Sequence, residues 1–281
     1  MLSVVLIVKN EEVYIQRCLE SLKDFDEIIV VDTGSEDNTK EKVKNFTDKI
    51  YDFQWNDNFA EARNFAKSKA TGDYILSIDA DEILLTPYTE IVKQLDEHNT
   101  YGITLEATNS KHKAVRLFKN IKEIFWVGAI HECLCIPAEK NIDVTIHYDY
   151  SPAHQLDPER TVRILEKELA KKPNLVREKY YYAREFWYKK DYEQAIKWFW
   201  KYLNCAVWLP EISDAYLYLA RCYWLTNQGD IARRCCNLAI GINPNFKEAL
   251  LFMAEISWED EAKVWRKLVE IATNEKALFR R

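Results

Sequence analysis

The stretch YILSIDADE, residues 74–82, passes from an apolar run directly into a cluster of acidic residues. Continuous β-branched and aliphatic runs are typical of strands that are buried on both faces of a parallel sheet. In an extended segment residues two apart share a face, so Asp79 and Asp81 project together while Ala80 points away. Two carboxylates directed at one point favour a divalent cation such as Mg²⁺ or Mn²⁺. The alternative is that one of the two aspartates caps a helix that begins near Glu82.

Two earlier segments repeat this arrangement of an apolar run followed by polar residues. SVVLIV (3–8) leads into KNEE, and EIIVV (27–31) leads into DTGSEDNT. Parallel strands would bring all three polar clusters to the same carboxyl edge, where open α/β sheets bind ligands. The remaining pattern of the first half predicts helices at 12–23, 37–47, 59–70 and 87–98, and closely spaced strands within 101–107, 114–119, 124–130 and 141–148.

Asp32 ends the second apolar run and is followed closely by Gly34. A carboxylate at this position can accept a hydrogen bond from an imide N–H such as that of uracil. Gly34 allows the chain to turn tightly beside it. Asp32 alone could equally stabilise a turn or cap a helix. Three polar clusters at one sheet edge are explained more simply by one nucleotide diphosphate site.

The composition indicates a packed globular protein of one large domain or two ordinary ones. The chain has 281 residues, of which 48% are hydrophobic, and a formal net charge of -6. Its acidic excess lies in the first half, which disfavours nucleic acid as a partner. We expect a soluble, cytoplasmic chain, because neither an apolar stretch of membrane-spanning length nor a basic leader is visible. The seven cysteines are expected to be reduced and mostly structural.

From about residue 155 the strand signals end and aromatic-rich helical segments repeat. Aligning Ala195 with Ala232 also aligns Ala183 with Ala220, and the pattern recurs at about 34 to 37 residues. Small residues at regular positions let paired helices stack closely. This part resembles the tetratricopeptide repeat, which implies an all-α domain for interaction or support. An irregular helical bundle is the alternative.

Several motifs of the first half occur in a fixed order that covers nearly all of residues 1–150. They are SVVLIVKNEE, EIIVVDTGSEDNT, WNDNFAEARNFA (55–66), DADE (79–82), VRLFKN (115–120), VGAIHE (127–132) and TIHYDY (145–150). Together they resemble an inverting nucleotide-sugar glycosyltransferase of family 2 with the GT-A fold. The resemblance implies an α/β domain with a Rossmann-like mixed sheet at residues 1–153, followed by the helical tetratricopeptide-like domain at 154–281.

The resemblance also implies where the sugar nucleotide binds. Val8 and Glu11 would line the nucleoside pocket, and Asp32 would recognise uracil. Arg63, in the sequence ARN, would lie beside the nucleotide. Without the other motifs, Arg63 would be read as a solvated helix residue.

A Mn²⁺ or Mg²⁺ ion is part of the implied site. Asp81 would bind the ion directly, and Asp79 would lie near the ribose or reach the ion through water. His147 matches a late histidine that completes the coordination in such enzymes. Taken alone, His147 could simply be a sheet histidine with satisfied hydrogen bonds.

The sequence departs from the common family pattern at the catalytic base. The usual Glu-Asp pair further along the chain has no clear counterpart. Glu132 is therefore the candidate base, with His131 orienting it or touching the donor phosphate, and Asp149 is held in reserve. The alternative is that His131 and Glu132 form only a polar strand end.

The predicted function is metal-dependent transfer of a sugar from a UDP-sugar to a protein or peptide. The arrangement is similar to bacterial and phage peptide S- or O-glycosyltransferases, including the S-glycosylating enzymes of glycopeptide bacteriocins, in which the helical part can also form a homodimer. A lipopolysaccharide core or another glycan is an alternative acceptor, and a DNA base is disfavoured by the acidic first half. A non-catalytic repeat scaffold is the alternative of a different class.

Overall fold

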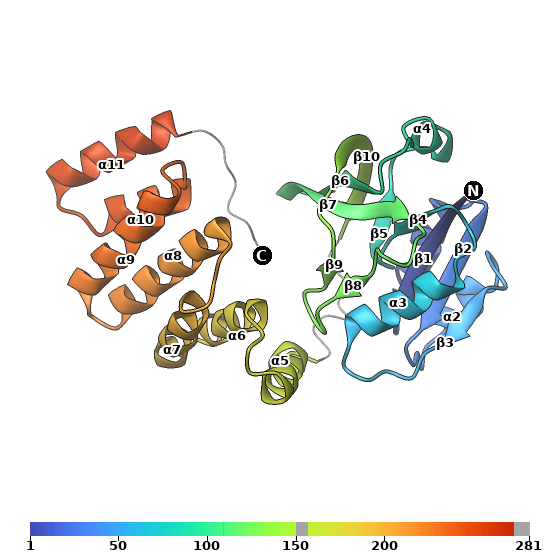
Figure 1. The fold of residues 1–281 in the computed structure, drawn as a ribbon, viewed down its shortest axis with the longest axis horizontal. Coiled ribbons are helices and arrows are strands. Elements are labelled where there is room, and N and C mark those ends of the chain that lie inside the picture. The colour runs from blue at the N-terminus through green and yellow to red at the C-terminus, as the bar shows by residue number, and fades with distance from the viewer. Residues whose placement is uncertain (109, 150–156, 273–281) are drawn as a thin grey trace. The chain divides into compact units, whose positions relative to one another are not determined.

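The protein consists of two compact units in a computed structural model that describes residues 1–108, 110–149 and 157–272. One unit spans Met1–Arg160 and the other Thr161–Arg281. The first contains a β-sheet with helices and the second contains helices (Figure 1). The predicted boundary between residues 153 and 154 lies outside the described residues.

An eight-stranded mixed sheet forms the centre of the first unit, in the order β3-β2-β1-β4-β7-β6-β10-β5. The first four are parallel, β7 runs antiparallel to β4 and β6, β10 is parallel to β6, and β5 is antiparallel to β10. A separate hairpin pairs β8 with β9. The strands are β1 (Leu2–Val8), β2 (Glu27–Asp32), β3 (Ile50–Asp52), β4 (Tyr74–Ser77), β5 (Glu82–Leu84), β6 (Thr100–Ala107), β7 (Ser110–Lys119), β8 (Trp126–Val127), β9 (Cys133–Leu134) and β10 (Lys140–Tyr148).

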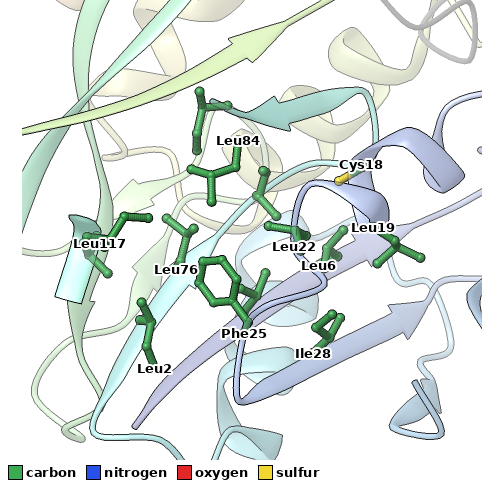
Figure 2. Packing of buried hydrophobic residues seen from close by; sticks show 14 of the residues in the cluster. Leu2, Leu6, Cys18, Leu19, Leu22, Phe25, Ile28, Leu76, Leu84 and Leu117 are labelled. Carbon is green, nitrogen blue, oxygen red and sulfur yellow. The ribbon is translucent and has the colours of Figure 1, made fainter. Parts of the chain in front are cut away.

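The central strands are buried on both faces, as their continuous apolar runs predict. Along β1, Val4 and Leu6 belong to the core on one face of the sheet, while Val5 belongs to the core on the other. Figure 2 shows the first of these cores, in which Leu19 and Leu22 pack beside strand residues such as Leu6. The loops at the carboxyl ends of β1, β2 and β4 therefore emerge from a rigid base.

The helices of the first unit are shorter than the sequence pattern predicts. They are α1 (Ile15–Glu20), α2 (Thr39–Val43), α3 (Phe59–Lys69) and α4 (Tyr88–Val92). At the end of α1 the Ser21 hydroxyl donates to the Cys18 carbonyl at 2.6 Å, and a local side-chain bond of this kind competes with further helix hydrogen bonds. Only α3 matches its expected length closely. It is capped by Asn58, whose side chain accepts from the Glu61 backbone N–H.

The prediction of a strand at residues 124–130 is mostly wrong. Only Trp126–Val127 is extended, because Gly128 follows with a φ of 93°. His131 is also left-handed, with a φ of 53°. Positive φ values break the extended backbone that a strand requires. The result is a short hairpin that places residues 129–132 in a turn.

The second unit is built of antiparallel helix pairs that follow one another along the chain. The pairs are α6 with α7, α8 with α9, and α10 with α11. Ala183 and Ala220 are fully buried in the first helices of two successive pairs, and Ala195 and Ala232 are fully buried in the second helices. The predicted fold, a GT-A-like mixed sheet followed by tetratricopeptide-like helices, is confirmed. The helices are α5 (Arg160–Lys171), α6 (Arg177–Tyr188), α7 (Tyr192–Leu203), α8 (Leu209–Leu225), α9 (Gly229–Ile242), α10 (Lys247–Glu255) and α11 (Glu259–Ile271).

Two properties of the whole chain can be compared with the sequence. All seven cysteines lie in the described residues and carry free thiols, four of them buried. Within the described ranges, every helix is too short or too polar to cross a bilayer.

Candidate functional site

The loops after β1 and β2 are joined by hydrogen bonds. The Val8 carbonyl accepts from the Thr33 backbone N–H at 2.9 Å, and the Thr39 hydroxyl accepts from the Glu11 backbone N–H at 2.8 Å. Val8 and Asp32 are also direct partners in the parallel ladder. Val8, Glu11 and Asp32, which the sequence analysis assigns to one nucleoside pocket, therefore lie on adjacent segments at the carboxyl edge.

The Asp32 carboxylate is used in part by its own turn. Its Oδ1 atom accepts from the backbone N–H groups of Gly34 at 2.7 Å and Ser35 at 2.8 Å. Oδ2 makes only a longer contact of 3.4 Å with the Ser35 N–H. Gly34 has a φ of 107°, which explains why a glycine stands there. Asp32 thus stabilises a turn and retains acceptor capacity on one oxygen.

The DADE motif forms a tight turn between β4 and β5. The Glu82 N–H donates to the Asp79 carbonyl at 3.1 Å, and the Asp79 N–H donates to Glu82 Oε2 at 2.8 Å. Two residues of α1 hold the backbone of this turn: Cys18 Sγ donates to the Asp79 carbonyl, and Arg17 Nη2 donates to the Asp81 carbonyl at 3.3 Å. The segment after the turn is a strand, so the alternative of a helix cap at this position is wrong.

A chain of ion pairs links this turn to the candidate base. Arg63 Nη1 lies 2.8 Å from Asp79 Oδ1, and Arg63 Nε lies 2.6 Å from Glu132 Oε1. On the other side of Asp79, Arg116 Nη2 lies 3.1 Å from Oδ2 and 3.5 Å from Glu82 Oε1. The Arg63 side chain is only 7% exposed. Buried charges of this kind persist when each has an opposite charge in contact.

Burial and the arginines together shift the pKa values of Asp79 and Glu82 in opposite directions. Burial disfavours ionisation of Asp79, but Arg63 and Arg116 outweigh it and hold its pKa well below the ordinary value. Burial raises the pKa of Glu82 to about 7, against the opposing effect of Arg116. Asp79 therefore carries a fixed negative charge at neutral pH, which its two arginines balance.

The ARN sequence on α3 fixes the hairpin that carries His131 and Glu132. The Asn64 side chain both accepts from the Trp126 N–H at 2.8 Å and donates to the Trp126 carbonyl at 2.9 Å. The Arg63 guanidinium lies over the Trp126 ring at 5.0 Å from its centroid. Arg63, expected beside the nucleotide, is thus placed between the DADE turn and Glu132.

His147 on β10 and Asp149, which follows the end of that strand, lie beside the DADE turn. In the antiparallel ladder His147 faces Ile83, and the Asp149 N–H donates to the Asp81 carbonyl at 3.3 Å. His147 Nε2 lies 3.4 Å from Asp149 Oδ1, and the other Asp149 oxygen pairs with Arg17 Nη2 at 2.7 Å. The ladder therefore brings two of the three predicted metal ligands, Asp81 and His147, to neighbouring positions.

The third predicted ligand, Asp79, has both oxygens in contact with arginines. Within the part of the chain that the structure describes, no three histidine, cysteine or acidic side chains are grouped as a preformed metal site. Mg²⁺ and Mn²⁺ bound with a nucleotide need only one or two protein ligands, because phosphate oxygens and water supply the rest. The carboxylate of Asp81 and the imidazole of His147 fit such an ion.

Sequence reasoning missed three contacts of the site, those of Arg17, Glu82 and Arg116. Arg116 lies within the quoted motif VRLFKN but received no role. A cation within the apolar stretch AVRLF (114–118) is an available signal, because a half-buried arginine needs an anionic partner. Arg17 had no such signal, since a charged residue on the polar face of a short amphipathic helix is ordinarily solvated.

The mixed sheet, with acidic residues at the carboxyl ends of its parallel strands, is GT-A-like. The family model described as glycosyl transferase family 2 matches residues 3–144, and the chain belongs to this family.

Individual relatives cover smaller parts of the chain. A TPR repeat-containing protein of Synechococcus elongatus is 38% identical over 138 residues, 46% of this chain and 34% of that protein. The lipopolysaccharide core biosynthesis glycosyltransferase LpsC of Rhizobium meliloti is 33% identical over 99 residues, 34% of this chain and 36% of that protein. The SPbeta prophage-derived glycosyltransferase SunS of Bacillus subtilis is 42% identical over 81 residues, 28% of this chain and 19% of that protein. The chain spans at most 36% of the length of these three relatives.

Among solved structures, S. aureus TarS in complex with UDP-GlcNAc is similar with a TM-score of 0.49 and 15% sequence identity. The similarity covers 83% of this chain and 90% of that chain.

Proposed function

We propose that this protein transfers a sugar from a UDP-sugar to a protein or peptide, with inversion at the anomeric carbon and with a bound Mn²⁺ or Mg²⁺ ion. The observation that carries the proposal is that Asp32 and the DADE turn follow parallel strands at one edge of the sheet, where Arg63 pairs with both Asp79 and Glu132. Uracil recognition, diphosphate binding and proton removal each have a residue of suitable chemistry there.

The donor side of the site would be formed by the segments at the carboxyl ends of β1, β2 and β4, together with His147 of β10. Val8 and Glu11 would line the nucleoside pocket, and Oδ2 of Asp32 would accept the uracil N–H. Asp81 and His147 would hold the cation. When bound, the cation would neutralise the charge that develops on the leaving diphosphate. Asp79, paired with two arginines, would act through water or on the ribose rather than as a direct ligand.

The acceptor side would depend on Glu132. An acceptor hydroxyl or thiol would attack the anomeric carbon while the bond from that carbon to the diphosphate oxygen breaks, and the acceptor proton would pass to Glu132. Arg63 would orient Glu132 by the contact from its Nε atom. His131 would orient the base or touch the phosphate, and Asp149 is the reserve base. A single displacement of this kind inverts the configuration.

Slow hydrolysis of UDP-sugars tests the donor half of the proposal. The protein should release UDP with Mn²⁺, and EDTA or Asp81→Ala should abolish the release. Asp24→Ala is a matched control. Asp24 is exposed and lies just before the first residue of β2, whereas the proposed site lies at the other end of β2, beyond Asp32. Absence of metal-dependent UDP release from the unaltered protein would leave the repeat scaffold as the better interpretation.

A protein or peptide acceptor is favoured by the helical unit, since stacked helix pairs present an extended surface for a polypeptide. The same unit could join two copies as a homodimer.

A glycan acceptor is the second candidate, and the similarity to LpsC, whose name refers to lipopolysaccharide core biosynthesis, favours it. Incubation with labelled UDP-glucose, UDP-galactose or UDP-N-acetylglucosamine and either a peptide library or core oligosaccharides distinguishes them: label on peptides supports the first, and label only on oligosaccharides the second.

A further inference from the structure

Arg116 is a cation placed from a neighbouring strand against the DADE turn. It precedes Leu117 on β7, and Leu117 pairs with Leu76 near the end of β4. Because the two strands are antiparallel, Arg116 lies level with the point where β4 ends and the turn begins. Its position is therefore set by the sheet and does not depend on the conformation of a loop.

The guanidinium of Arg116 connects the two ends of the turn. Nη2 contacts Asp79 Oδ2 at 3.1 Å and Glu82 Oε1 at 3.5 Å. The exposed fractions of the side chains are 15% for Arg116, 6% for Glu82 and 29% for Asp79, so water screens the Arg116–Glu82 contact most weakly. Without the guanidinium, two carboxyl groups would face each other with less compensating charge.

Asp81 lies between the two residues that Arg116 holds. The Asp79 N–H and Glu82 carboxylate close the same turn, and Arg17 and Cys18 hold its carbonyl groups from α1. The backbone direction at Asp81 is thus fixed from both sides before any ligand arrives. A carboxylate that binds a metal with a phosphate must be held in place in this way, and the residues that orient ligands contribute strongly to affinity.

We propose that Arg116 is a positioning residue of the donor site: by bridging Asp79 and Glu82 it holds the turn so that Asp81 can bind the cation together with UDP. The inference rests on the proposed function. It assigns Arg116 to the binding of the cation and nucleotide and not to the transfer step. Loss of the bridge should therefore weaken cation and UDP binding and leave the turnover rate at saturation nearly unchanged.

The test compares full-length Arg116→Gln and Arg116→Lys with the unaltered protein. Calorimetry gives the Mn²⁺ concentration for half-maximal UDP binding, and UDP release gives kcat and KM. Arg116→Gln should need about 10 to 100 times more Mn²⁺, the range found when residues that orient metal ligands are replaced. Arg116→Lys should also be weakened, though less, because one ammonium cannot hold two carboxyl groups in the geometry of a guanidinium.

Lys111→Gln is the matched control, since Lys111 lies on the same strand and pairs with Glu106, away from the turn. It should bind as the unaltered protein does. Thermal melting shows which variants are folded, and if Arg116→Gln is not, Arg116→Lys decides. Unaltered Mn²⁺ dependence in a folded Arg116 variant, or a fall in kcat alone, overturns the inference. If the unaltered protein does not bind UDP with Mn²⁺, the proposed function itself has failed.

Discussion

Glu27 makes the stability of the sheet depend on pH. It begins β2 at the end remote from the proposed site and is 5% exposed. Its carboxylate accepts from the Ser3 hydroxyl and pairs with Lys49, and it also accepts from the Thr71 backbone N–H at 2.8 Å and the Thr71 hydroxyl at 2.9 Å. One buried carboxylate therefore joins β1 and β2 to the segment that precedes β4.

These contacts lower the pKa of Glu27 to about 2, although burial alone would raise it. A lowered pKa in the folded state stabilises the protein above the unfolded pKa, and the stabilisation is lost as the pH falls toward the folded value. The interval between 4.5 and about 2 corresponds to about 3 kcal/mol at pH 7, falling to about 1 kcal/mol at pH 3.

The free energy of unfolding of Glu27→Gln should therefore be about 3 kcal/mol lower than that of the unaltered protein at pH 7. At pH 3 the two free energies should be closer, with a difference of about 1 kcal/mol. Urea unfolding followed by pulsed hydrogen–deuterium exchange of peptides from β1 and β2 measures the free energy of the sheet unit alone. Asp24→Asn, at an exposed position just before β2, is the control and should show no such difference. Equal stability of Glu27→Gln and the unaltered protein at pH 7, or a difference that is the same at both pH values, would refute the reasoning.

Three further predictions concern other parts of the chain. Arg63→Gln should abolish UDP release and destabilise the sheet unit by about 3 to 5 kcal/mol, because it removes the cation paired with Glu132 and leaves Asp79 with Arg116 alone. Urea unfolding that is unchanged would contradict this. Gly34→Ala should lower the free energy of unfolding by about 1 to 3 kcal/mol through backbone strain alone, since no atom lies within 4 Å of the added Cβ. It should also weaken UDP binding in calorimetry, because it distorts the Asp32 turn. Unaltered stability and unaltered UDP binding would argue against this. Tyr180→Phe removes the hydroxyl that donates to the buried Asp214 carboxylate, whose pKa is raised by burial. The variant should destabilise the helical unit by about 1 to 3 kcal/mol in urea unfolding. A variant as stable as the unaltered protein would show that the hydrogen bond contributes little.

Much of the architecture could be predicted because its signals are local. The apolar runs at β1, β2 and β4 require burial on both faces, and the repeated alanines Ala183 and Ala220 require close helix packing. Two short strands were not predicted, Ile50–Asp52 and Glu82–Leu84. Each has only three residues, which is too few to show the alternation that marks a strand in a sequence.

The sequence predicts which residues belong to the site better than it predicts which of them contact one another. The order of motifs identifies Asp32, Asp79 and Asp81 as residues of one sheet edge, since parallel strands end together. Which acid meets which arginine depends on how α3, β7 and the β8–β9 hairpin, which are far apart in sequence, pack around the DADE turn. Arg63 is therefore found between Asp79 and Glu132, a pairing that no spacing in the sequence indicates.

The most direct test of the account is the position of Mn²⁺ in a crystal of the protein grown with UDP, located by its anomalous scattering. The account predicts one manganese ion bound by Asp81 and the diphosphate, with His147 beside it and the uracil against Asp32. A diphosphate that binds without the ion, or an ion far from Asp81, would contradict it.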